Sequence, residues 1–446
     1  MSFAAERGDV GQSGGSLTLS KRIGLLWGGK QFSPMFWTFF AAAFFYDFGV
    51  GLYFFLFNLF LANLHFNEKA IGLITGALTL GNVAGTIPVS LMARRFGLQR
   101  LLLFCFVAGA LLCIIRTLIV NMPAQIALAF FTGAALSCWP VCFSPVVARL
   151  TSEDNRVSAF SIVFATGIGS GTLAGIVGGY LPEVLKATGA TRPLVDDMRI
   201  VLLFACGIVL LGVWPVLRLR LGPPEVTEKR RFRLIHPFLF RFLPPFALWS
   251  LVTGSFIPFA AIYLQQHLGI PLGRVGLIFS ASQLTQFSAV LLAPLLYRRF
   301  GTITGIMCTQ VATGAAVFAL GRSHDSSVSV ACYLSYSGLQ FMSGPGIYSL
   351  LMNRIPDSER STASAVQNIV GALSQAAAAV ITGSMLVRYG YPKVLAGNGG
   401  VALAAALLLY LLLGSLDTRK NGGVTLTGDN YSNVSSPGSA GEAAAG

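Results

Sequence analysis

Apolar runs of about 20 residues recur along the chain from Met35 to Ser415, and this recurrence limits the possible folds more than any other feature. A helix of that length crosses a hydrocarbon core roughly 30 Å thick. We expect each run to be a helix, because an unpaired backbone group facing lipid costs several kcal/mol and a helix pairs its own groups. The twelve expected spans are 36–63, 69–93, 101–121, 123–150, 156–182, 199–220, 240–267, 272–297, 302–321, 327–353, 361–388 and 392–414.

The composition agrees with a chain whose solvent is largely lipid. Apolar residues make up 54% of the 446 residues and charged residues only 11%, against roughly 25% charged in soluble domains. The seven cysteines fall inside the expected spans without metal-site or redox spacing, so we interpret them as packing residues. We expect no cofactor and no metal. The sequence contains no phosphate-binding loop of the kind found in ATPases, and no nucleophile paired with a base that would indicate an enzyme.

We interpret the net charge of +14 as an indication of membrane topology rather than of a nucleic-acid partner, because the basic residues are spread over the loops. Assigning loops alternately to the two sides places most of the 31 Lys and Arg on the side of both termini. By the positive-inside rule both termini are then cytoplasmic, and we expect a multi-pass protein of a bacterial inner membrane. The expected parts are an N-terminal tail (1–34), a six-helix half (35–221), a cytoplasmic linker (222–237), a second six-helix half (238–416) and a disordered tail (417–446).

Three signatures recur at one offset of 204 residues, which predicts an internal duplication. The first is Ile-Gly-Leu-Ile at 71–74 and Val-Gly-Leu-Ile at 275–278. The second is Arg-Arg-Phe-Gly at 94–97 and again at 298–301. In the third, an acid precedes an Arg by three residues, at 153–156 and 357–360. Because each unit contains an even number of spans, both halves enter on the same side and form parallel repeats.

The stretch 90–100 resembles the signature of the major facilitator superfamily, roughly Gly-x-x-x-Asp-Arg-x-Gly-Arg-Arg between the second and third helices. Arg95, Gly97 and Arg100 match it, whereas Arg94 occupies the position of the acid and Ser90 that of the first glycine. The resemblance covers 36–415. It implies an all-α membrane protein of two pseudo-symmetric six-helix bundles that carries a small molecule by alternating access.

The missing acid matters for the gate that the resemblance implies at the cytoplasmic side. In the family this acid is thought to hold the inward gate together with neighbouring Arg. We predict that Glu153 or Asp154 supplies the missing charge to Arg94, Arg95 and Arg149. The predicted gate residues are Arg94, Arg95, Gly97, Arg100, Arg149, Glu153, Arg156, Arg298, Arg299, Gly301 and Arg360.

Asp47 is the one acidic residue that falls deep inside an expected span. An Asp there costs roughly 2.5–3.5 kcal/mol on insertion scales, so something must offset it. It shares a helix face with Gly51, Phe54 and Asn58. Two interpretations stay open: a stripe that lines a central cavity and binds a proton, a cation or a substrate amine, or a protonated structural Asp packed between helices. The first is our working hypothesis.

The resemblance implies that the first, fourth, seventh and tenth helices line the cavity. The predicted cavity residues are Asp47, Asn58, Trp139, Trp249, Tyr263, Gln283, Gln286, Tyr336, Gln340 and Asn368. Arg116 lies near the outer end of its span, and we expect it to extend to the lipid headgroups rather than pair with Asp47.

These features predict a secondary transporter that acts as a monomer. A single acid and an aromatic cavity favour a small, neutral or weakly cationic organic substrate and proton-coupled efflux. Uptake or facilitated diffusion of sugar-like or other neutral solutes is the alternative, because amides with Trp and Tyr also suit hydroxyl-rich ligands. A protein that moves lipid or senses a ligand without coupled transport is a third possibility.

Overall fold

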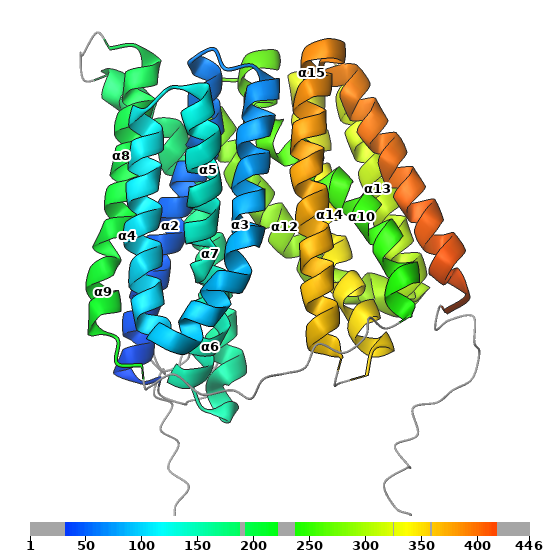
Figure 1. Ribbon diagram of the computed structural model, residues 1–446. Coiled ribbons are helices and arrows are strands. Elements are labelled where there is room, and N and C mark those ends of the chain that lie inside the picture. The colour runs from blue at the N-terminus through cyan, green and yellow to red at the C-terminus, as the bar shows by residue number, and fades with distance from the viewer. Residues whose placement is uncertain (1–31, 188–191, 222–236, 324, 357–358, 417–446) are drawn as a thin grey trace, which may run out of the picture.

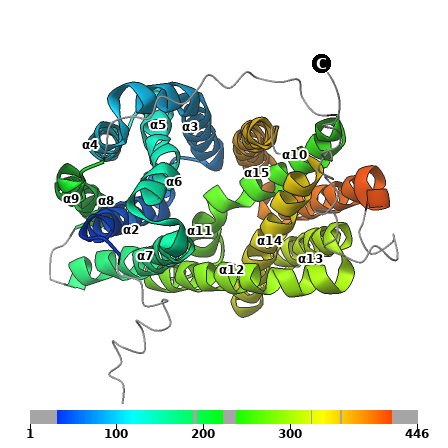
Figure 2. The same ribbon diagram turned by 90° about the horizontal axis from the view of Figure 1, so that it is seen from below.

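The computed structural model describes residues 32–187, 192–221, 237–323, 325–356 and 359–416, and every regular element in these ranges is helical. Two bundles stand side by side (Figures 1 and 2). The first bundle contains α2 (Pro34–Asn63), α3 (Glu68–Phe96), α4 (Leu98–Leu118), α5 (Met122–Leu136), α6 (Cys138–Leu150), α7 (Glu153–Ala187), α8 (Leu194–Leu211) and α9 (Val213–Arg218). The second contains α10 (Phe238–Phe256), η1 (Ile257–Phe259), α11 (Ala260–Ile262), η2 (Tyr263–His267), α12 (Leu272–Phe300), α13 (Thr302–Arg322), α14 (Ser326–Arg354), α15 (Arg360–Leu413) and η3 (Gly414–Leu416).

The helices are those of a multi-pass membrane protein. Within the described ranges, ten stretches are long and apolar enough to cross a membrane. One of them, Thr362–Leu416, has 55 residues and is interrupted at Gly390, whose φ is 74°. Figure 1 shows α15 as two antiparallel arms that join at the top. The 29-residue α14 is not among the ten stretches, and it carries many serines.

Both ends of the described helical region lie at one face of the molecule. In Figure 1, α2 begins and α15 ends at the bottom, which we call the terminal face, and we call the opposite side the distal face. Successive long helices run alternately between these two faces.

The offset of 204 residues reappears in the geometry of the two bundles. Gly97 and Gly301 end α3 and α12 with φ of 83° and 88°, a left-handed conformation that favours glycine. In the same way, Arg156 donates from Nη2 to the Ala148 carbonyl at 3.5 Å, and Arg360 donates from Nε to the Met352 carbonyl at 3.0 Å. Equivalent backbone and side-chain contacts at one offset are what a duplicated unit predicts.

The span expected at 240–267 is not one regular helix. After Phe256 the chain passes through η1, α11 and the π-turn η2. Such irregular turns free backbone carbonyls from the helical hydrogen-bond pattern. The Pro258 carbonyl accepts a hydrogen bond from Asn58 Nδ2 of the first bundle at 3.1 Å. This irregular segment therefore joins the two bundles.

The bundles pack against each other along two seams, α3 with α15 and α7 with α12 (Figure 2). Glycines let the backbones approach. A Cβ on Gly72 would lie 2.4 Å from the Ala379 carbonyl oxygen, and one on Gly276 would lie 2.2 Å from the Gly175 carbonyl oxygen. These residues belong to the distal parts of their helices, because α3 and α12 start at the distal face.

The hydrogen bonds that cross between the bundles lie in the same distal region. Among the described residues they join Asn58 to Pro258, Asn63 to Gln265 at 3.1 Å, Glu183 to the Gly273 amide at 2.9 Å, and Ser280 to the Thr172 carbonyl at 2.6 Å. By contrast, the terminal part of α3 carries exposed residues such as Ile87 and Leu91. The described contacts thus close the interface toward the distal face.

Candidate functional site

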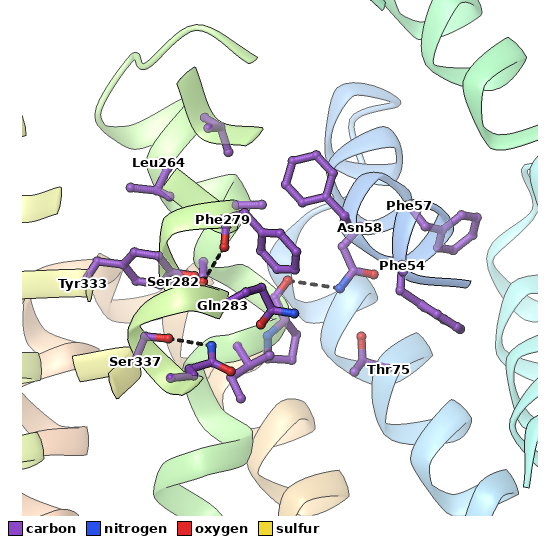
Figure 3. Close-up of a pocket in the computed structure, with 18 of the residues that line it drawn as sticks. Phe54, Phe57, Asn58, Thr75, Leu264, Phe279, Ser282, Gln283, Tyr333 and Ser337 are labelled. Atoms are coloured by element: carbon purple, nitrogen blue, oxygen red, sulfur yellow. Dashed lines mark hydrogen bonds between the residues drawn. The ribbon is translucent and has the colours of Figure 1, made fainter. Parts of the chain in front are cut away.

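A cavity of about 380 Å³ lies between the two bundles, next to these distal contacts. Its volume falls in the range of small-molecule binding sites. The wall combines α2, α3 and α4 of the first bundle with η1, α11, η2, α12 and α14 of the second. In Figure 3, Asn58 and Thr75 lie on one side of it, and Phe279 and Gln283 on the other. Its aromatic lining is Phe54, Phe55, Phe57, Phe279, Tyr333, Tyr336 and Phe341.

Polar side chains interrupt this aromatic wall. Gln286 Nε2 donates to Ser337 Oγ at 2.7 Å, which joins α12 to α14 (Figure 3). Two buried atoms of α14, the Tyr336 hydroxyl and Gln340 Oε1, have no hydrogen-bond partner in the described structure. A buried polar group without a partner is costly, and a ligand that formed a hydrogen bond with either atom would offset that cost.

Five of the ten predicted cavity residues line this cavity: Asn58, Gln283, Gln286, Tyr336 and Gln340. Their lining position agrees with the prediction, and their part in binding stays a prediction. All are polar residues of α2, α12 and α14, the kind of side chain that hydrocarbon disfavours most.

Four other predicted residues lie elsewhere. Trp139 stacks on Tyr46 with ring centroids 4.2 Å apart, in an aromatic cluster of the first bundle. Trp249 packs in the apolar core of the second bundle. The Tyr263 hydroxyl donates to the Leu320 carbonyl at 3.3 Å, and Asn368 is exposed on α15. Helical spacing groups residues on a face but does not determine which way that face points.

Asp47 lies one turn from the cavity rather than in its described lining. It is half-buried on α2, four residues before the lining residue Gly51. Its Oδ2 atom faces α7, 3.5 Å from where a Cβ on Gly167 would lie. The carboxyl group therefore lies at the contact between α2 and α7.

Arg116 is placed differently from the sequence-based expectation, which was wrong. Its side chain is 1% exposed and lines the cavity instead of extending toward headgroups. Its Nε donates to Gln125 Oε1 at 3.3 Å, and its guanidinium lies 4.3 Å from the centroid of the Phe57 ring. The chain turns directly from α4 into α5, which brings Gln125 back onto Arg116 and holds the side chain inside the bundle. Nothing in the local sequence marks this contact.

The predicted gate residues lie at the terminal face. Arg94, Arg95, Arg100 and Arg298 are exposed there, Arg299 lies beside Phe300 with 5.5 Å between guanidinium and ring centroid, and Arg149 is half-buried at the end of α6. The side chains of Glu153 and Asp154 lie outside the described residues. The proposed acid clamp therefore stays a prediction.

The sequence profile described as Major Facilitator Superfamily matches residues 39–379 and 250–431. The chain belongs to the major facilitator superfamily. No curated protein sequence matches it. Membership in this family indicates a transporter of small molecules rather than an enzyme, embedded in a membrane as a multi-pass protein.

Solved structures of other transporters share the fold. The nucleoside transporter NupG superposes with a TM-score of 0.71 at 14% identity, over 85% of this chain and 99% of that one. A D-xylose–proton symporter superposes with a TM-score of 0.67 at 15% identity, over 84% of this chain and 97% of that one. The third structure is a bacterial homologue of the human lysosomal transporter Spinster in an inward-facing, unoccupied conformation. It superposes with a TM-score of 0.66 at 12% identity, over 86% of this chain and 96% of that one. At these identities the likeness concerns the fold alone.

Proposed function

We propose that this chain is a secondary transporter that carries a small, partly apolar organic molecule by alternating access, with the cavity between the bundles as its binding site. One observation carries the proposal: the cavity is walled by both bundles, and the described hydrogen bonds between the bundles lie in the distal half of the molecule, beside the cavity or beyond it. Rocking the bundles apart at these contacts would open the same cavity to the other face.

The proposed topology has twelve crossings, six in each bundle, with the two arms of α15 and the single helix α14 each counted as crossings. The halves are 35–221 and 238–416, joined by the linker 222–237, and the protein acts as a monomer. Exposed Arg94, Arg95, Arg100 and Arg298 at the terminal face support a cytoplasmic location for that face in a bacterial inner membrane. On this assignment the structure is inward-open.

The proposed driving force is a proton that binds Asp47, and the proposed direction is export. Asp47 lies one turn from the cavity, at a contact between α2 and α7, where a change of its charge would alter how the two helices pack. Uptake of a hydroxyl-rich solute is the second candidate, because the cavity wall contains the amides of Asn58, Gln283, Gln286 and Gln340. The similar structures include a nucleoside transporter and a D-xylose–proton symporter.

Distances between the bundles at both faces test alternating access without a known substrate. Dye pairs at Ser152 and Pro356 report the terminal face, and pairs at Asn121 and Ser326 report the distal face; all four positions are exposed. Exposed Cys308 is first replaced by serine. In single-molecule energy transfer with the protein in lipid nanodiscs, we expect two states in which one distance shortens as the other lengthens. A single state, or distances that vary independently, would contradict the proposal.

Asn63→Ala should shift this equilibrium modestly toward the distal-open state. The substitution removes the hydrogen bond from Asn63 Nδ2 to Gln265 Oε1 across the interface. A hydrogen bond of this kind contributes about 1 kcal/mol net, so the population ratio should change roughly fivefold. Asn353→Ala is the control, because Asn353 bonds to Ser349 within α14. Equal shifts in the two variants would show that the Asn63 contact does not hold the distal interface.

A further inference from the structure

Arg116 brings a positive charge into the wall of the cavity. It is the only charged side chain among the described residues that line the cavity, and no described carboxylate lies within 4 Å of its nitrogens. Its Nη1 atom is buried without a hydrogen-bond partner. An unpaired buried charge costs several kcal/mol, because the group loses water and gains no counter-charge. An anion bound in the cavity would offset this cost.

The guanidinium is also held in place before any ligand arrives. Gln125 Oε1 accepts from Arg116 Nε, and the Gln125 amide nitrogen donates to the Ile119 carbonyl at 2.6 Å and to the Arg116 carbonyl. The Phe57 ring lies against the guanidinium. With Nε engaged by Gln125 and the side chain fixed, Nη1 is left without a hydrogen bond in a residue that lines the cavity. A fixed, planar guanidinium favours carboxylates, whose oxygens match its donors.

The remainder of the wall indicates what the anion is attached to. Phe54, Phe55 and Phe279 provide an apolar middle section. The unpartnered Tyr336 hydroxyl and Gln340 Oε1 belong to α14 of the second bundle, whereas Arg116 belongs to α4 of the first. We infer that the substrate is an amphipathic organic carboxylate, with its anionic end on Arg116, an aromatic or aliphatic body, and a hydrogen-bonding group toward Tyr336 and Gln340.

This inference rests on the proposed function and names its substrate class. The sequence favoured a neutral or weakly cationic compound because Asp47 was the only charge expected in the cavity. In the structure Asp47 is not among the described residues that line the cavity, and the charged residue in that lining is Arg116. A ligand that contacts both bundles would also favour a state in which they approach each other, as alternating access requires.

Equilibrium binding to the purified protein in lipid nanodiscs tests the assignment. The probes are aryl-alkanoates with one to four methylenes, including 3-(4-hydroxyphenyl)propionate, each with its primary amide and the matched amine, here tyramine. Calorimetry should show at least one carboxylate binding tenfold or more tighter than its amide, and the amine weakest. Arg116→Gln should reduce carboxylate affinity roughly 10- to 100-fold, the loss of a hydrogen bond to a charged group, and leave the amide unchanged.

Two further variants separate a binding role from a structural one. Gln125→Glu places a carboxylate beside Arg116, so it should abolish the carboxylate preference even if Arg116→Gln folds poorly. Glutamate cannot donate to the Ile119 and Arg116 carbonyls as Gln125 does, so thermal denaturation is measured to establish that the variant is folded. Arg322→Gln is the matched control, because Arg322 ends α13 with its guanidinium 5.9 Å from the Phe318 ring centroid and is exposed. It should bind all probes as the wild type does.

The inference is overturned if no carboxylate in the series binds more tightly than its amide, if the amines bind best, or if Arg116→Gln and Gln125→Glu keep the preference. These outcomes leave alternating access standing, because the distance measurements between the bundles require no ligand. Conversely, a carboxylate preference in a protein with a single conformational state would support the binding site and refute the transport cycle.

Discussion

Gly276→Ala is expected to drive the protein out of the conformation described here. A Cβ at this position would lie 2.2 Å from the Gly175 carbonyl oxygen and 2.9 Å from Gly179 Cα, across the seam between α12 and α7. Both are backbone atoms and cannot rotate away. Overpacking of this kind costs about 1–3 kcal/mol, and the upper end applies here. The distal-open population should therefore rise by roughly 100-fold, measured by the dye pairs at the two faces.

The same argument extends to the other seam and supplies its own control. In Gly72→Ala the added Cβ would lie 2.4 Å from the Ala379 carbonyl oxygen, so this variant should also raise the distal-open population. Gly400→Ala should leave the distribution unchanged, since a Cβ there has no atom within 4 Å. If Gly276→Ala keeps the wild-type distribution while remaining folded by thermal denaturation, the α7–α12 seam does not open during the cycle.

Much of the fold follows from the sequence because lipid imposes simple constraints. The length of an apolar run limits it to a helix, and the offset of 204 residues predicts two related bundles before any contact is known. The positive φ at Gly97 and Gly301 and the matching contacts of Arg156 and Arg360 show the same offset in three dimensions. The irregular turns after Phe256 were not predicted, because Pro258 is the one local signal for them.

The cavity was predicted only in part, for a physical reason. Polar residues in an apolar helix must avoid lipid, so Gln283, Gln286 and Gln340 could be assigned to the interior from their chemistry. Aromatic residues carry no such constraint. Trp139 packs against Tyr46 and Phe106 within one bundle, and its sequence position does not distinguish this packing from contact with a ligand. Arg116 was missed because a long basic side chain near a helix end usually reaches the interface.

Asp47 has a position that allows a proton to act on the helices. Its carboxyl group faces Gly167 of α7, and the described structure records no ion pair for it. A negative charge at such a contact between α2 and α7 must be neutralised by a proton or reached by water. On the proposed cycle, a conformational change that alters the surroundings of Asp47 would change its affinity for the proton. The ratio of the two conformations should then depend on pH, by at most tenfold per unit for a single proton.

Asp47→Asn is expected to remove this pH dependence. Asparagine has nearly the same shape as the protonated acid but cannot ionise, so the variant should show, at every pH, the distribution that the wild type reaches at low pH. The dye pairs at both faces measure the ratio between pH 5 and 9. The wild type should change by up to tenfold per unit over part of this range, and the variant by less than about 1.5-fold.

Asp325→Asn is the control for this measurement. Asp325 caps α14 at the distal face by accepting from the Ser327 and Val328 amides at 2.6 and 3.1 Å, a role that asparagine also performs. The ratio of the two conformations in Asp325→Asn should therefore change with pH as it does in the wild type. If Asp47→Asn keeps that change too, the coupling proton binds elsewhere. If the wild type itself shows no change with pH, Asp47 is a packed structural acid, as in the second interpretation of its sequence position, and movement of the substrate is not coupled to protons through this residue.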